Sequence, residues 1–185
     1  YKVLLLLSSL TENSKEARLC NGNFDDVRDA VLRSHPWNVG ITRKALPKDS
    51  ETPAFGFSFQ FSLPTDPFCL RVLSFWNSNV NNDVAAYDSN VMFKIEGCKV
   101  LSNEDTCNII YIGRITDTEQ YDSLLNKAIS ARLAAEIAYN ITGSNSIASN
   151  MIALYEARLK EAKGVDSMEG FPEQPQADDF TNIRL

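Results

Sequence analysis

The stretch TDTEQYDSLLNKAISARLAAEIAYNITGS, residues 116–144, decides the fold of this chain. Its apolar side chains recur at three- and four-residue steps and cover most of a helical circumference, so the helix that they predict packs on two sides. Thr116 is a candidate N-cap followed by acidic residues, and Gly143 is the residue type that commonly follows a helix C-terminus. The sequence therefore predicts a central helix from Thr116 to Thr142.

Helices are also expected on both sides of the central one. After a capping signal at Asn13-Ser14-Lys15-Glu16, apolar and charged residues alternate with helical spacing as far as Pro36, which cannot continue a helix beyond His35. Ser144 begins a third amphipathic helix that runs to about Lys163. The third helix is expected to form an antiparallel hairpin with the central one.

The region between the first helix and the central one has the two-residue period of β-strands. Every second residue from Phe55 to Phe61 is a phenylalanine, which predicts one strand face of four buried rings. Five strands are predicted, at residues 55–62, 69–76, 91–96, 99–101 and 108–112. A turn at residues 63–67 makes a hairpin of the first two, and a polar loop at 77–83 follows them. We expect one small antiparallel sheet.

These elements predict an α+β fold, in which an antiparallel helical bundle is interrupted by a small antiparallel β-sheet insertion and followed by an extended C-terminal arm. A single domain is expected over residues 1–167. Its helical core comprises residues 1–48 and 114–167, and its β insertion comprises residues 53–113. The arm, residues 168–185, is rich in proline and acidic side chains.

The tip of the arm is apolar again. It contains Phe180, Ile183, Arg184 and Leu185, and apolar side chains at the end of an extended segment cannot be buried locally. We therefore expect these four residues to bind another surface, either on the parent domain or on another subunit.

Composition and charge restrict the class of protein. With 44% hydrophobic and 23% charged residues, the chain has the balance of a folded domain. Its formal net charge of -6 provides no basic field that would hold a nucleic-acid backbone. The longest wholly apolar run, residues 3–7, is far shorter than the about 20 residues of a membrane-spanning helix, so no membrane role is expected. This run is interpreted as the last turns of a buried helix, with the tail of a signal peptide as the alternative.

No catalytic, cofactor-binding or metal-binding residues are predicted. The cysteines Cys20, Cys69, Cys98 and Cys107 lie in or beside apolar segments without zinc-ligand spacing, which indicates free, mostly buried thiols in a reducing cytoplasm. The single histidine, His35, is expected at a helix C-terminus, where a structural role is commoner than a catalytic one. Two alternatives stay open: a small hydrolase that uses His35 or surface carboxylates, and a monomeric binding module with a hydrophobic β groove.

Several short strings follow one another along the chain. They are SKEAR at 14–18, DAVLR at 29–33, HPWN at 35–38, RKAL at 43–46, PAFG at 53–56, CLRVL at 69–73 and ARLAAEIAY at 131–139. In this order they resemble the tail tubular protein A family of podoviruses, the short-tailed phages, and of prophages. The resemblance covers residues 4–185, but Pro67 and Phe68 look like an insertion and the loop at 77–83 matches no pattern of the family.

The resemblance implies a structural virion protein and not an enzyme. Members of this family are head-to-tail adaptors: a ring of subunits, twelve in the characterised members, joins the portal to a tail nozzle, which is a tail tubular protein B-like protein. The genome DNA passes through the lumen of the ring during ejection without specific binding. The expected location is the head–tail connector of a virion assembled in the host cytoplasm.

Overall fold

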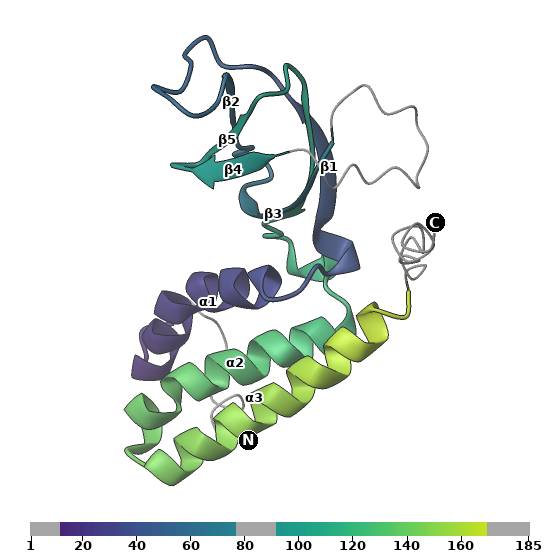
Figure 1. Ribbon diagram of the computed structural model, residues 1–185. Helices are drawn as coiled ribbons and strands as arrows, with labels where there is room; N and C mark the ends of the chain where they lie inside the picture. Colours follow the sequence, from purple (N-terminus) through teal and green to yellow (C-terminus); the bar gives the residue numbers. More distant parts are fainter. Residues whose placement is uncertain (1–11, 77–91, 170–185) are drawn as a thin grey trace, which may run out of the picture.

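The structure is a computed structural model that describes residues 12–76 and 92–169 of the chain (Figure 1). Within these residues it contains three α-helices and two three-stranded antiparallel sheets, so the predicted α+β class is confirmed. Figure 1 shows the helices at one end of the molecule and the sheets at the other, with helix α1 (Lys15–Arg33) nearest to the sheets.

The remaining elements follow α1 in the chain. The helical ones are η1 (Asn38–Gly40), η2 (Thr118–Gln120), α2 (Ser123–Thr142) and α3 (Asn145–Asp166). The strands are β1 (Ile41–Leu46), β2 (Phe59–Ser62), β3 (Cys69–Trp76), β4 (Phe93–Glu96), β5 (Lys99–Ser102) and β6 (Cys107–Gly113). All of these strands lie between α1 and α2 in the sequence, but β1 lies before residue 53, inside the segment 1–48 that was predicted to belong to the helical core.

Helix α1 begins and ends close to where the sequence predicts. The Ser14 hydroxyl oxygen accepts a hydrogen bond from the Ala17 N–H at 3.1 Å and caps the first turn. The helix ends shortly before Pro36, and Trp37 then turns back into the core. The indole N–H of Trp37 donates to the Val31 carbonyl oxygen at 3.0 Å, so the polar atom of this fully buried ring is paired.

Helix α2 begins at Ser123 and not at Thr116, so the predicted start is wrong. The Asp117 carboxylate accepts the Glu119 N–H at 3.0 Å and closes the separate 3₁₀ turn η2. Asp122 then caps α2, because its carboxylate accepts N–H groups of the first helical turn. The residue just before Asp122 has an extended backbone, which separates the two helical pieces.

The central helix packs on two sides, as its composition predicts: α2 contacts both α1 and α3. Gly143 ends it with a left-handed φ of 67°, a conformation that glycine adopts without strain. The Ser144 hydroxyl caps α3, which runs back along α2 as far as Asp166. The predicted antiparallel hairpin is therefore confirmed, and its second helix extends slightly past the expected end at Lys163.

The strands form two sheets, so the prediction of one five-stranded sheet is wrong. In sheet A, β6 lies between β1 and β3, and in sheet B, β5 lies between β2 and β4. The expected hairpin of β2 and β3 does not form, because these strands belong to different sheets. Each of them pairs with a strand that comes much later in the chain, and a local turn signal does not specify such a partner.

The turn predicted at Gly97 is confirmed. Gly97 and Cys98 have φ angles of 54° and 62°, which is the conformation of a two-residue hairpin turn. Strand β4 accordingly pairs with β5 across this turn, with Glu96 opposite Lys99 and Lys94 opposite Leu101.

Two further features of the sheets differ from the predictions. The sequence pattern does not predict β1, because Arg43 and Lys44 interrupt its apolar residues; β1 tolerates them at the edge of sheet A. Only Phe59 and Phe61 of the alternating phenylalanines lie in β2, and Phe55 is 88% exposed. The predicted face of four buried rings is therefore wrong.

Two clusters of buried side chains form the core. The first lies between the helices and sheet A, and its members are Val27, Val31, Leu32, Trp37, Leu70, Ile112, Ile115, Tyr121, Leu125, Ile129 and Ala162. The second lies between the two sheets, and its members are Leu46, Phe61, Phe75, Val100, Cys107, Ile109 and Tyr111. Tyr111 and Ile112 are neighbours on β6, and successive side chains of a strand point to opposite faces of the sheet. They therefore belong to different clusters. Sheet A therefore belongs to both cores.

Three predicted elements lie outside the described residues: the helix turns at 3–7, the loop at 77–83, and the arm from residue 170 onward. Of the helices in the described part of the chain, none has both the length and the hydrophobicity of a membrane span.

Candidate interaction surfaces

The predicted binding residues Phe180, Ile183, Arg184 and Leu185 lie outside the described residues. The structure does describe the root of the predicted arm, because α3 ends at Asp166 and the described chain continues to residue 169. The contacts of this root, and the exposed apolar surfaces elsewhere, are the features that bear on binding.

A cluster of hydrogen bonds holds the end of α3 to the connector between α1 and β1. The Asp166 carboxylate, 7% exposed, accepts the Asn38 N–H at 3.0 Å and lies 2.9 Å from His35 Nε2. The Asn38 side-chain amide donates to the Asp166 carbonyl oxygen at 2.7 Å, and the Lys163 ammonium donates to the Ser34 carbonyl oxygen at 3.3 Å. We call these five residues the Asp166 clamp. Both oxygens of one buried carboxylate join two distant segments of the chain.

His35 is part of this clamp and lies just beyond the end of α1. Its ring also meets the Trp37 ring edge to face, with the ring centroids 4.8 Å apart. An imidazole beside a carboxylate also occurs in catalytic sites. Here the second oxygen of the Asp166 carboxylate binds the backbone N–H of Asn38, so the pair fastens the connector to α3.

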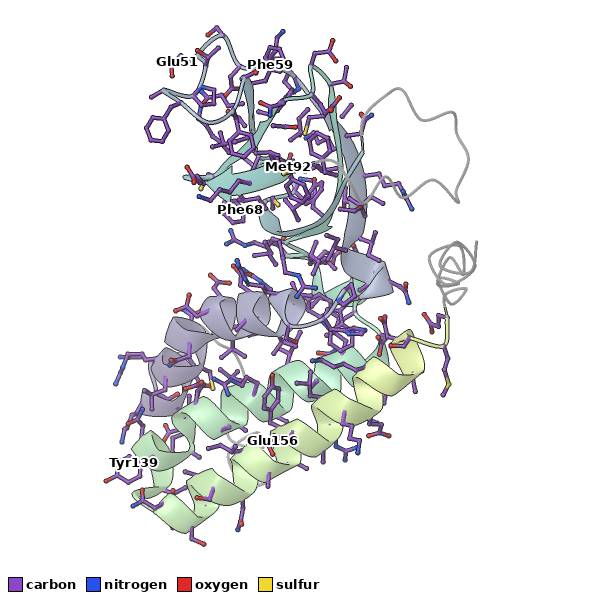
Figure 2. The ribbon with its side chains drawn as sticks, viewed as in Figure 1. Glu51, Phe59, Phe68, Met92, Tyr139 and Glu156 are labelled. Carbon is purple, nitrogen blue, oxygen red and sulfur yellow. The ribbon has the colours of Figure 1, made fainter. Side chains whose placement is uncertain are left out.

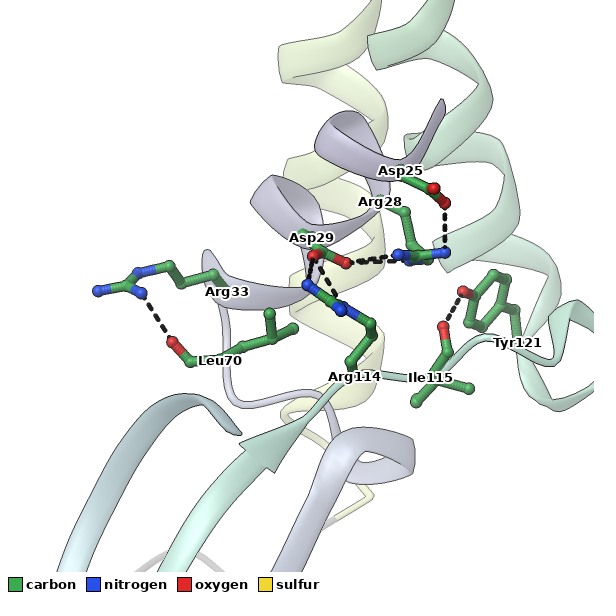
Figure 3. Close-up of polar contacts among 8 residues, drawn as sticks. All are labelled: Asp25, Arg28, Asp29, Arg33, Leu70, Arg114, Ile115 and Tyr121. Atoms are coloured by element: carbon green, nitrogen blue, oxygen red, sulfur yellow. Dashed lines mark hydrogen bonds and ion pairs between the residues drawn. The ribbon is translucent and has the colours of Figure 1, made fainter. Parts of the chain in front are cut away.

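Charged side chains join α1 to the sheets (Figure 3). The Asp29 carboxylate pairs with the Arg28 guanidinium at 2.9 Å and also with Arg114, the residue that follows β6. Arg28 is 6% exposed and pairs with Asp25 at 2.7 Å as well. A buried guanidinium requires such partners, because an uncompensated buried charge is strongly destabilising. Asp29 therefore connects α1 to the segment after β6 through Arg114, and it also pairs with Arg28 on its own helix.

Backbone acceptors add to the same connection (Figure 3). The Arg33 guanidinium donates to the Leu70 carbonyl oxygen at 2.7 Å, and Arg71 donates to the Arg33 carbonyl oxygen at 3.1 Å, so α1 and β3 are tied in both directions. Nearby, the Tyr121 hydroxyl donates to the Ile115 carbonyl oxygen at 2.7 Å. Together with the first core cluster, these contacts hold the helices and sheet A in one orientation. We call this set of polar contacts the junction.

One side of α3 carries a row of exposed apolar side chains. Ile147, Leu154 and Val165 are 42%, 38% and 45% exposed, and at about 100° per residue their spacings place them on the same side of the helix. Figure 2 shows Tyr139, which is also exposed, at the end of the molecule where α2 and α3 are joined. The exposed ion pair of Arg158 and Glu161 lies on the same side between Leu154 and Val165, so charge separates the apolar side chains. We call these three residues the α3 row.

Strand β4 is a second exposed apolar surface. All four of its residues are exposed, including Phe93 and Ile95, and Met92 before it is exposed as well (Figure 2). Phe93 stacks on Phe75 of β3 with the ring centroids 5.5 Å apart, so this side of β4 lies at the margin of the second core cluster. In the described part of the chain β4 pairs with β5 alone and forms one edge of sheet B. Open strand edges are ready templates for further strands.

The opposite edge of sheet B is covered. Lys48 forms a bridge with Phe61 of β2, and the Asp49 N–H donates to the Gln60 carbonyl oxygen at 3.0 Å. The Asp49 carboxylate accepts a hydrogen bond from the Lys99 ammonium at 2.6 Å, and this bond holds the pKa of Asp49 below its ordinary value. The two edges of sheet B thus differ: residues 48 and 49 cover the β2 edge, whereas no described strand pairs with the outer side of β4.

A cleft of about 240 Å³ lies where η1, η2 and the end of β6 meet. Its lining includes the Asp117 carboxylate and the Arg114 guanidinium. The first caps η2 and the second pairs with Asp29, so both charges already serve the fold.

The cysteines are free thiols, as predicted. Burial raises the pKa of Cys69 to about 11 and that of Cys107 to about 12, so both thiols stay protonated and unreactive at neutral pH. Cys20 is also buried, whereas Cys98 in the turn between β4 and β5 is exposed. Within the described residues, no three histidine, cysteine or carboxylate side chains gather as they would around a metal ion.

Sequence reasoning missed the Asp166 clamp, the junction and the open β4 edge. The i,i+3 spacing of Asp25 and Arg28 is a local signal for one ion pair of the junction. Arg114, which pairs with Asp29, lies 85 positions after it in the chain, so no local pattern indicates this contact. The clamp joins His35 to a carboxylate 131 positions later and has no local signal at all. The alternating charges of β4 indicated an exposed strand and could have identified an edge.

No protein-family model matches this sequence, and no curated protein matches it either. The resemblance to tail tubular protein A therefore stays a prediction that rests on the strings quoted above.

Proposed function

We propose that this chain is a structural virion protein: an adaptor subunit whose ring joins the portal to the tail nozzle and forms part of the DNA ejection channel. The observation that carries the proposal is the presence of two sets of exposed apolar side chains, the α3 row on the helices and the β4 edge of sheet B. Exposed apolar rows are stabilised when another chain covers them. The junction between the two ends suits a subunit that must hold its neighbours in fixed positions.

A ring requires two different contact surfaces on each subunit, because a head-to-tail contact repeats until the ring closes. The helical end and the sheet end of this molecule supply different surfaces. Twelve subunits is the number that the resemblance implies. The net charge of -6 per subunit also suits a channel, since phosphates are held by lysine and arginine, and the DNA would pass without specific binding.

In this proposal the helices form an antiparallel bundle interrupted by the β insertion, and residues 168–185 leave it as an arm. The tip residues Phe180, Ile183, Arg184 and Leu185 bind a neighbouring subunit or the portal. The Asp166 clamp supports this role, because it holds the point from which the arm departs. Besides its own copies, the partners are the portal and a tail tubular protein B-like nozzle, in a virion assembled in the host cytoplasm.

The decisive experiment is electron microscopy and native mass spectrometry of the purified chain, alone and mixed with its portal. We expect a ring of subunits seated on the portal. A chain that stays monomeric and leaves the portal bare would contradict the adaptor role and favour a monomeric binding module.

The arm is tested by truncation. Deleting residues 180–185 should leave the melting temperature unchanged and weaken incorporation into portal-bound rings, because the apolar tip supplies most of the binding energy. The matched control is Asp178→Ala with Asp179→Ala, which removes charge from the arm and keeps the tip; this variant should assemble normally. Truncated subunits that join portals as well as the full chain would show that the arm does not bind.

The alternative of a small hydrolase is favoured by one observation, the 2.9 Å approach of His35 to Asp166. We propose that the chain is not an enzyme and that this pair is structural. His35→Ala should then lower stability without abolishing any turnover. Hydrolysis of an ester or glycan by the purified chain, lost in that variant at a temperature where it stays folded, would establish the enzyme instead.

A further inference from the structure

We propose that two copies of this chain pair through the open edge of β4, with the two strands antiparallel and related by a twofold axis. A twofold pair is closed and cannot grow into a ring, so it is a state of the free subunits. The inference therefore goes beyond the adaptor role and does not depend on it.

Within the described residues, the outer edge of β4 has no paired strand. Because a two-residue turn closes the β4–β5 hairpin, Glu96 and Lys99 on either side of it form a hydrogen-bonded pair, and such pairs then alternate along the ladder. The N–H and C=O groups of Ile95 and Phe93 consequently point away from β5. On that side, no strand of the described residues pairs with β4.

The side chains on the two faces of β4 determine which side chains a further paired strand must carry. Ile95 lies opposite the buried Val100, and with Phe93 it extends the apolar inner face of sheet B beyond the core. Lys94 and Glu96 lie on the other face, 64% and 52% exposed, and form a salt bridge at 2.6 Å. An added strand must therefore cover apolar side chains on one face and offer one negative and one positive charge on the other.

A second copy of β4 meets both requirements. When Ile95 lies opposite the partner subunit's Ile95, antiparallel pairing places Lys94 opposite the partner's Glu96 and Glu96 opposite the partner's Lys94. The two sheets B then form one continuous sheet, and the apolar side chains of both strands cover each other beside the second core cluster. This self-complementary order of charges identifies the occupant as another copy of the chain.

The contact is short, with four residues of β4 from each copy. It buries much less than the roughly 1,200 Å² that stable protein complexes bury. We therefore expect a dimer that dissociates on dilution and that other contacts can replace during assembly.

Sedimentation velocity of the full chain over a wide range of concentrations tests the pairing. Reductant is included, so that the exposed Cys98 cannot link copies through a disulfide. Ile95→Pro removes the one N–H of this residue, which faces away from β5, and proline is tolerated in edge strands at such positions. This variant should be monomeric at every concentration with an unchanged circular dichroism spectrum. Ile95→Val keeps the N–H and should dimerise like the parent chain.

Charge reversal tests the register. Lys94→Glu alone, or Glu96→Lys alone, places like charges opposite each other twice and should weaken the dimer by roughly tenfold or more. An equimolar mixture of the two variants places opposite charges across both positions and should restore dimerisation. A contact through another surface would show no such restoration.

Each outcome decides the inference. A chain that is monomeric at all concentrations, or a dimer that persists in the Ile95→Pro variant, would overturn it. A dimer with the expected mutational pattern supports the pairing even if no ring forms on a portal, so the two proposals fail separately.

Discussion

Strand β6 is almost wholly apolar in sequence, whereas β4 alternates apolar and charged residues, and the fold gives the two strands opposite surroundings. β6 lies in the middle of sheet A and is buried at every position except Asn108, whereas β4 lies at the edge of sheet B and is exposed at every position. Sheet A contributes to both core clusters and sheet B only to the second. The main division in this molecule therefore runs between the two sheets and not between helices and strands.

The two sheets of the β insertion are attached to the rest of the molecule in different ways. Sheet A shares Leu70 and Ile112 with the helices and is also held by the junction, so it is part of the helical core. Sheet B is attached through the second cluster and its β4 edge is open. We expect sheet A to unfold together with the helices, and we expect changes at the β4 edge to have local effects.

The largest effect should come from the same substitution made in the two sheets. Ile112→Ala removes a fully buried side chain that contacts the helical core and should lower the free energy of unfolding by about 2–5 kcal/mol. Ile95→Ala, at a position that is 44% exposed, should cost less than about 1 kcal/mol. Urea denaturation followed by circular dichroism measures both. Equal losses would show that sheet B is as firmly integrated as sheet A.

The next effect tests the junction that holds sheet A to α1. Asp29→Ala leaves the buried Arg28 with only the exposed Asp25 as a partner and should cost about 1–3 kcal/mol. Asp25→Ala is the matched control: Asp25 is 77% exposed, so this change should cost less than about 0.5 kcal/mol. Thermal melts of the two variants in the same buffer decide the matter. If the two variants have the same melting temperature, the buried Arg28 does not need Asp29 as a partner for stability.

A similar but smaller loss is expected at the Asp166 clamp. Asp166→Ala removes the acceptor of the Asn38 N–H and the partner of His35 and should cost about 1–2 kcal/mol. The same variant should speed proteolytic cleavage at the end of α3, because this end loses its attachment to the connector. Glu161→Ala, which removes only an exposed pair with Arg158, serves as the control and should leave the cleavage rate unchanged.

The smallest effect concerns the sealed edge of sheet B and depends on pH. The pKa of the Asp49 carboxyl is lower in the folded chain than in the unfolded chain, because Lys99 binds its charged form. Its contribution to stability is therefore present above the unfolded carboxyl value of about 3.9 and is lost as the pH falls below it. Lys99→Met should cost about 0.5–1 kcal/mol at pH 7 and less than this at pH 2.5, because part of the Asp49 carboxyl is then protonated. A loss that is the same at both pH values would show that Asp49 is not the cause.

Much of the helical part could be predicted from the sequence, because helix signals are local. Ser14 and Ser144 cap α1 and α3, Gly143 ends α2, and Pro36 lies just past α1, all within a few residues of what they affect. The start of α2 was the exception, because Asp117 and Asp122 are both good caps and only the packed backbone between them selects the second. The hairpin turn at Gly97 was predictable for the same local reason.

The strand partners, the buried polar contacts and the open edge were decided by the tertiary structure. β3 lies where it was predicted and β2 covers only the second half of its predicted strand. Their partners β5 and β6 lie far along the chain, and a local pattern cannot choose between distant strands of similar composition. The same holds for Asp29 with Arg114 and for His35 with Asp166: each residue type is ordinary on its own. The sequence by itself thus determined where most of the helices form, but it did not determine the burial of every apolar residue, since Phe55 is exposed. Packing decided which residues meet, because burial is non-directional and only the assembled chain brings distant groups within hydrogen-bonding distance.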